Sequence, residues 1–126
     1  MMHRRLLLAA SLLALPARAR AHGNTTGPHG GPIGEAGSTH VELVARDGEI
    51  RIHVLDAQDR PATARGASGS AVVQSGGRNH AIRLEMGPDD AYLVGRGEFA
   101  ARGARVVATL TLPGQPQRSV RFAAIP

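Results

Sequence analysis

The fold is decided by residues 40–54, which read HVELVARDGEIRIHV. Apolar side chains take every second position on both sides of a central Asp-Gly pair. This period of two is typical of β-strands that bury one face. The alternating apolar residues are Val41, Leu43, Ala45, Ile50, Ile52 and Val54. We therefore expect two antiparallel strands joined in a hairpin, with these side chains facing the core.

The turn of this hairpin also predicts its register. Asp47-Gly48 is a strong two-residue hairpin signal, because both central residues of the favoured turn need a positive φ angle. A two-residue turn places Arg46 opposite Glu49, a favourable charge pair, so residues paired across the strands have numbers that sum to 95. Glu42 then lies opposite His53, on one face of the hairpin.

The remaining chain continues the strand pattern. Alternating or apolar runs at residues 70–74, 80–86, 91–95, 105–112 and 120–124 are separated by turn sequences such as SGGR at 75–78 and PGQP at 113–116. About seven short strands at this spacing favour an all-β fold, a single antiparallel Greek-key or immunoglobulin-like β-sandwich over residues 39–126. A small open barrel is the alternative. The chain has neither the Cys pair nor the Trp of true immunoglobulin domains, so this likeness is one of architecture.

Residues 1–21 have the layout of a secretory signal peptide. A positively charged start at residues 3–5 precedes an apolar run at 6–15, which Pro16 ends, and Ala-x-Ala follows at 17–19 and 19–21. The run is too short for a spanning helix, which needs about 20 residues. We expect general secretory export to the periplasm, cleavage after Ala19 or Ala21, and no membrane span after processing. An ordinary N-terminal helix is the alternative.

Composition disfavours several classes of partner and site. The chain has 15 Arg, no Lys and 10 acidic residues, for a net charge of +5, but cleavage after Ala21 removes four arginines and leaves a charge of +1. With mixed charges and only one Tyr and two Phe, neither a basic surface nor a stacking platform for nucleic acid is expected. The absence of cysteine excludes disulfides and thiolate metal sites.

Residues 22–38 contain six Gly, two Pro and one large apolar residue, Ile33. Such a stretch buries too little surface to offset the entropy of ordering it. We expect a flexible arm that carries His22 and His29.

Histidine is the commonest metal-binding side chain, and its neutral ring suits Zn(II) and Cu(II). His40, Glu42 and His53 share one face of the predicted hairpin, within reach of one another. His29 from the arm is a further candidate ligand, and His22 is another if its ring and a new α-amino group chelate Cu(II). The alternative is that the hairpin residues form an ordinary wet face. His80 is interpreted as a strand-end residue.

A family resemblance rests on PHGG at residues 28–31, THVELV at 39–44, IHVLD at 52–56 and Arg60-Pro61. Over residues 28–122 the chain resembles small periplasmic β-sandwich proteins and the related N-terminal domain of periplasmic adaptor subunits of heavy-metal efflux pumps. The resemblance implies export, a sandwich fold and a link to metal resistance, with His29 and His40 as ligands. The family pattern has an aromatic residue where His53 stands. The coiled-coil and lipoyl-like parts of an adaptor are missing here.

The sequence does not predict an enzyme. It contains no Gly-x-Ser-x-Gly elbow, and Asp89-Asp90 is interpreted as a turn rather than a catalytic pair. We expect a periplasmic protein that buffers or delivers Zn(II) or Cu(II) in metal efflux or resistance, with an efflux adaptor or another envelope protein as a partner. The alternative is a metal-free module that docks on an envelope protein through a sheet edge. A copper mono-oxygenase built on His22 is disfavoured.

Overall fold

The computed structural model describes residues 25–126. The expected signal peptide, the cleavage site and His22 lie outside these residues. The described chain forms eight strands and one 3₁₀ turn: β1 (Ile33–Ala36), β2 (Thr39–Arg46), β3 (Glu49–Val54), β4 (Ser68–Ser75), β5 (Arg78–Met86), η1 (Pro88–Asp90), β6 (Tyr92–Arg96), β7 (Arg105–Thr111) and β8 (Arg118–Arg121).

All strands pair antiparallel in one sheet, in the order β1-β2-β3-β6-β5-β4-β7-β8. Strands β4, β5 and β6 are neighbours in sequence and in space, while β3 lies beside β6 and β7 lies beside β4. The long connections from β3 to β4 and from β6 to β7 each complete a Greek key. The predicted antiparallel Greek-key fold is therefore confirmed.

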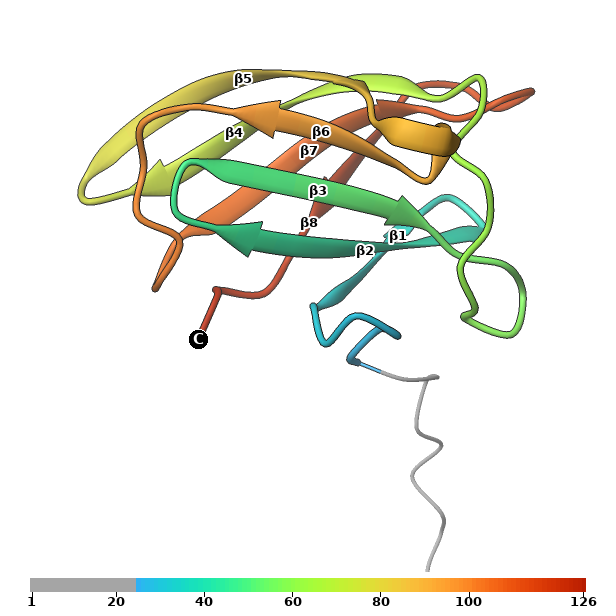
Figure 1. The fold of residues 1–126 in the computed structure, drawn as a ribbon, viewed down its shortest axis with the longest axis horizontal. Helices are drawn as coiled ribbons and strands as arrows, with labels where there is room; N and C mark the ends of the chain where they lie inside the picture. Colours follow the sequence, from blue (N-terminus) through green and yellow to red (C-terminus); the bar gives the residue numbers. More distant parts are fainter. Residues whose placement is uncertain (1–24) are drawn as a thin grey trace, which may run out of the picture.

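The sheet folds over on itself into a nearly closed, barrel-like shape (Figure 1). At one side β1 packs against β8. At the other, β5 joins β6 through only two residue pairs, Glu85–Val94 and Met86–Leu93. The two layers that the sequence predicted as a sandwich are thus continuous with each other. The apolar side chains of both layers meet between them, and those that are essentially inaccessible include Val41, Leu43, Ile50, Ile52, Val73, Leu93, Val106 and Leu110.

The first hairpin has the predicted register. Val41 pairs with Val54, Glu42 with His53 and Arg46 with Glu49. The expectation for its turn is wrong in one respect, because only Gly48 adopts a positive φ, of 78°. Asp47 instead accepts a hydrogen bond from the Ala101 N–H at 2.9 Å. The turn conformation is therefore shaped by a long-range contact that local turn propensity does not include.

The predicted flexible arm needs a correction over residues 25–38. Within this segment β1 pairs with β2, from Ile33 opposite Glu42 to Ala36 opposite Thr39. Upstream of β1, the Ile33 N–H donates to the Thr25 carbonyl at 3.1 Å. The prediction counted only apolar burial, whereas backbone pairing and a buried carboxylate order this segment. The strand β1 raises the count from about seven, expected from spacing, to eight.

Candidate functional site

A loop over residues 25–32 encloses the carboxylate of Glu42, whose side chain has no exposed surface. One carboxylate oxygen, Oε2, accepts hydrogen bonds from the backbone N–H groups of His29 at 2.8 Å and Gly31 at 2.9 Å. The other, Oε1, lies 2.8 Å from Nδ1 of the His29 ring. Burying a carboxylate is costly unless its oxygens are hydrogen-bonded, and here the loop supplies three donors.

The two glycines of the PHGG motif, and Gly27 directly before it, allow the loop to approach this closely. A Cβ atom on Gly31 would lie 1.8 Å from the Leu43 carbonyl oxygen, and one on Gly27 would lie 2.3 Å from the Glu42 carboxyl carbon. Gly30 has a φ of 85°, in the left-handed region that glycine adopts at little cost. The Gly30 N–H closes the turn on the Gly27 carbonyl at 2.9 Å. The motif is therefore the sequence of a loop that wraps Glu42.

The ring of His29 stacks on that of His53, with centroids 4.0 Å apart and planes 22° apart. On its other side His53 contacts Tyr92, with centroids at 5.1 Å. Burial lowers the pKa of His53 below its usual value, His29 and Arg51 add to this effect, and Glu42 opposes it. His53 is therefore a neutral imidazole at neutral pH, as a metal ligand must be.

Glu42 orients the ring of His29. A carboxylate accepts and cannot donate, so the hydrogen bond at 2.8 Å requires the ring proton on Nδ1. The lone pair of a neutral His29 then lies on Nε2, and 40% of the side chain is exposed. This carboxylate–histidine arrangement is the one that commonly fixes the tautomer of a metal-binding histidine.

A hollow of about 580 Å³ opens beside the two histidines. Its other lining residues include Arg51, Tyr92, Thr63 and the η1 residues Asp89 and Asp90. The guanidinium carbon of Arg51 lies 4.6 Å from the centroid of the Tyr92 ring, a distance suited to cation–π attraction. Asp90 is already paired with Arg65 at 3.1 Å. The hollow thus brings cationic, anionic and imidazole groups together.

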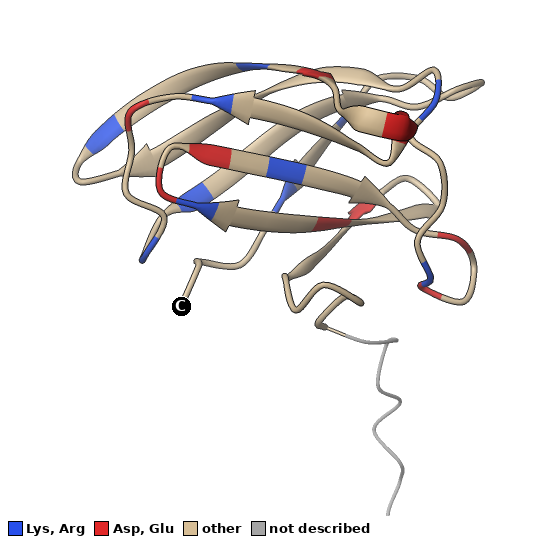
Figure 2. Cartoon of the chain, viewed as in Figure 1, with Lys and Arg blue, Asp and Glu red and all other residues tan. Residues whose placement is uncertain are grey.

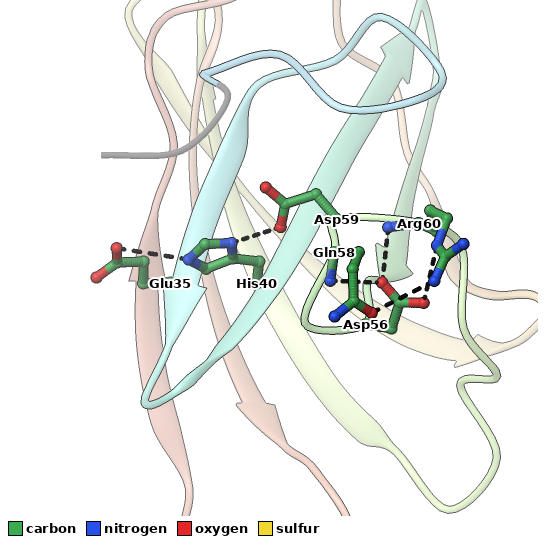
Figure 3. A network of polar contacts seen from close by, with 6 residues as sticks. All are labelled: Glu35, His40, Asp56, Gln58, Asp59 and Arg60. Atoms are coloured by element: carbon green, nitrogen blue, oxygen red, sulfur yellow. Dashed lines mark hydrogen bonds and ion pairs between the residues drawn. The ribbon is translucent and has the colours of Figure 1, made fainter. Parts of the chain in front are cut away.

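His40 lies in a separate network (Figure 3). Its Nδ1 is 2.6 Å from Oδ1 of Asp59, and its Nε2 is 3.7 Å from Oε1 of Glu35, its cross-strand neighbour on β1. Asp59 reaches His40 from a turn in which its own φ is 57°. The turn begins at Asp56. The pKa of Asp56 is held below its usual value by hydrogen bonds from the N–H groups of Arg60 and Gln58, while burial acts in the opposite direction.

The structure therefore brings together three of the five candidate metal residues. His29, Glu42 and His53 meet, His40 bonds elsewhere, and His22 lies outside the described residues. Among residues 25–126, no group of three or more His, Asp or Glu side chains is arranged to hold a metal ion. Glu42 is buried and accepts a hydrogen bond from the His29 ring. It therefore does not lie on a solvent-exposed face of the hairpin, as the alternative interpretation expects.

Sequence reasoning missed Arg51 and Tyr92. It placed His80 correctly on a strand but did not identify the aromatic ring that His80 contacts. His80 lies on β5 with its ring centroid 6.0 Å from that of Phe99. The pairing of β3 with β6, which sets His53 opposite Tyr92, has no local signal. Arg51 could have been found, because it lies two residues from His53 on β3 and so shares its face.

In the part of the chain that the structure describes, no helix has the length and apolar character needed to cross a membrane. Comparisons of the chain with protein-family models, with curated proteins and with solved structures found no match. The resemblance to small periplasmic proteins and efflux adaptor domains accordingly stays a prediction.

Proposed function

We propose that this chain is exported to the periplasm and there binds a divalent transition metal, Zn(II) or Cu(II), through His29 and His53. In this proposal it buffers or delivers the ion in metal efflux or resistance, and it catalyses no reaction. The observation that carries the proposal is the chain of contacts from the Glu42 carboxylate through the His29 ring to the stacked His53 ring.

Each residue has a distinct role in the proposed site. His29 offers Nε2 while Glu42 holds its other nitrogen, and His53 adds a second imidazole that burial keeps neutral by lowering its pKa. Glu42 is a positioning residue, because both its oxygens are occupied within the loop. Because the two rings are stacked, ion binding needs a change in their relative orientation in which His29 keeps its hydrogen bond to Glu42.

Two protein ligands leave two coordination positions open, since Zn(II) is commonly four-coordinate. An open site exchanges its ion readily, which suits buffering or delivery better than storage. The alternative, a metal-free module that docks through a sheet edge, stays a prediction. Among residues 25–126, Val72 and Met86 are the only exposed large apolar side chains.

The test is titration of the exported, untagged protein with Zn(II) and Cu(II), followed by native mass spectrometry and calorimetry. We expect one ion per chain at micromolar concentration. Binding should be lost in the His29→Ala and His53→Phe variants. Binding should persist in His40→Ala and in the control His80→Ala, whose histidine lies outside the proposed site.

Failure of the unmodified protein to retain either ion would overturn the proposal, as would equal binding by all four variants. Loss of binding only in His40→Ala would move the site to the network of Glu35 and Asp59. The intact mass would also identify the mature N-terminus, and a His22→Ala variant would show whether that residue contributes a ligand.

A further inference from the structure

Arg51 has more hydrogen-bonding capacity than the protein uses. Among residues 25–126, its Nε is the only buried side-chain nitrogen or oxygen without a hydrogen-bond partner. The only ion pair of its guanidinium in that part of the chain joins Nη2 to Oε2 of Glu49 at the long distance of 3.5 Å. A buried donor left unpaired is costly, and in a native structure such a group calls for a physical explanation.

The carboxylate of Glu49 is already occupied by other arginines. Arg46 Nε lies 2.7 Å from its Oε2, and Arg96 Nη2 lies 3.3 Å from its Oε1. Three guanidinium groups therefore surround one carboxylate, beside the β2–β3 turn where Figure 2 shows basic and acidic segments together. Of the three, only Arg51 lines the hollow beside the histidines. The surplus positive charge is thus presented to that hollow.

The hollow is also larger than an ion requires. Its volume of about 580 Å³ falls in the range of small-molecule sites, roughly 300–1,000 Å³, whereas one water molecule occupies about 30 Å³. The described residues supply two imidazoles and no third suitable ligand. An ion bound by His29 and His53 therefore has both open coordination positions and space for a small organic molecule beside it.

We propose that the hollow takes the metal ion as a complex with a small carboxylate chelator, whose free carboxylate pairs with Arg51. This inference rests on the proposed function, because the same two histidines hold the ion. The chelator fills coordination positions that the protein leaves open, and Arg51 is suited to hold its carboxylate through paired N–H donors. The exposed Asp89 also lines the hollow, and its negative charge disfavours a second free carboxylate there.

The experiment measures Zn(II) binding at a constant free Zn(II) concentration, with and without citrate as the probe. We expect citrate to raise the apparent affinity roughly tenfold to a hundredfold, the effect of one charge-assisted hydrogen-bonded pair. Native mass spectrometry should show a species containing protein, Zn(II) and citrate. The Arg51→Met variant should lose the effect of citrate, so that its affinity for Zn(II) is the same with and without citrate.

Arg96→Met is the matched control, since Arg96 belongs to the same cluster around Glu49 and does not line the hollow. It should keep the effect of citrate. Zn(II) binding that citrate does not strengthen would overturn this inference while leaving the proposed function intact. Absence of Zn(II) binding in every condition would overturn both. Citrate binding that persists in His29→Ala without Zn(II) would show an independent anion site and also refute the complex.

Discussion

The substitution Glu42→Gln tests the central contact of the site, because it keeps the shape of the side chain and removes its charge. The carboxylate accepts three hydrogen bonds, from the His29 N–H, the Gly31 N–H and the His29 ring. A hydrogen bond to a charged group contributes about 1.5–3 kcal/mol and one between neutral groups about 0.5–1.5 kcal/mol. Weakening three such bonds by about 1 kcal/mol each gives a loss of about 3 kcal/mol.

Part of this loss is offset, because a neutral amide no longer requires a buried charge to be desolvated. We therefore expect the free energy of unfolding to fall by about 1–3 kcal/mol. Urea denaturation followed by far-ultraviolet circular dichroism measures this change. The control is Glu85→Gln on β5, where the side chain is exposed, and it should leave the free energy of unfolding unchanged.

The same substitution should move a proton on His29. The single amide oxygen of Gln can stay with the two backbone donors now bound to Oε2. Its NH₂ group then faces Nδ1 of His29, which must become an acceptor, so the ring proton moves to Nε2. Since a protonated nitrogen cannot bind a metal, we expect affinity for Zn(II) to fall by about tenfold to a hundredfold.

Nitrogen-15 NMR of the histidine rings distinguishes the two tautomers directly. We expect Nδ1–H in the unmodified protein and Nε2–H in Glu42→Gln. Unchanged stability together with an unchanged tautomer would refute the assignment of Glu42 as the residue that orients His29.

Three further predictions, with their control substitutions, test other contacts. His53 has a folded pKa below its ordinary value of 6.5, so its contribution to stability is complete above pH 6.5 and decreases as the pH falls toward the folded pKa. His53→Phe should remove this dependence, up to about 1.4 kcal/mol per pH unit, in denaturation curves compared across pH 5 to 8; equal slopes in both proteins would contradict it. Gly31→Ala should detach the loop, because its Cβ would lie 1.8 Å from the Leu43 carbonyl oxygen. Hydrogen exchange of the Leu43 N–H would then accelerate. In the control Gly30→Ala the new Cβ meets no atom within 4 Å, and the free energy of unfolding should fall by only about 1 kcal/mol because of the positive φ. Asp59→Ala should destabilise the protein by about 2 kcal/mol, through a strained φ and a lost hydrogen bond to His40. Asp59→Asn should destabilise it by about 1 kcal/mol or less, since Asn tolerates that φ. Equal losses of stability in thermal denaturation would exclude the backbone effect.

The strand pattern could be predicted because it depends on neighbouring residues. Alternation over residues 40–54 placed Leu43 and Ile52 in the core, and the two-residue turn set Glu42 opposite His53. Strand β1 could not be found in this way. Its four residues include one large apolar side chain, Ile33, and its order comes from pairing with β2, a contact that composition does not reveal.

The candidate site was only partly visible for the same reason. The predicted face brought Glu42 and His53 together, but hairpin geometry alone could not show that residues 25–32 fold back and bury the carboxylate. That burial changes Glu42 from a candidate ligand into a residue that orients His29. His40 departs from the predicted group because Asp59, 19 positions later in the chain, lies 2.6 Å from its ring.

By itself, the sequence determined the antiparallel β-class, the register of the first hairpin and the residues that form its buried face, because periodicity and turn chemistry act over a few residues. Only the tertiary structure decided the rest. The closing of the sheet, the enclosure of Glu42, the stacking of His29 on His53 and the position of Arg51 beside Tyr92 all join segments that are distant in the chain. These contacts depend on how the Greek-key connections return, and no local pattern of residues encodes that path.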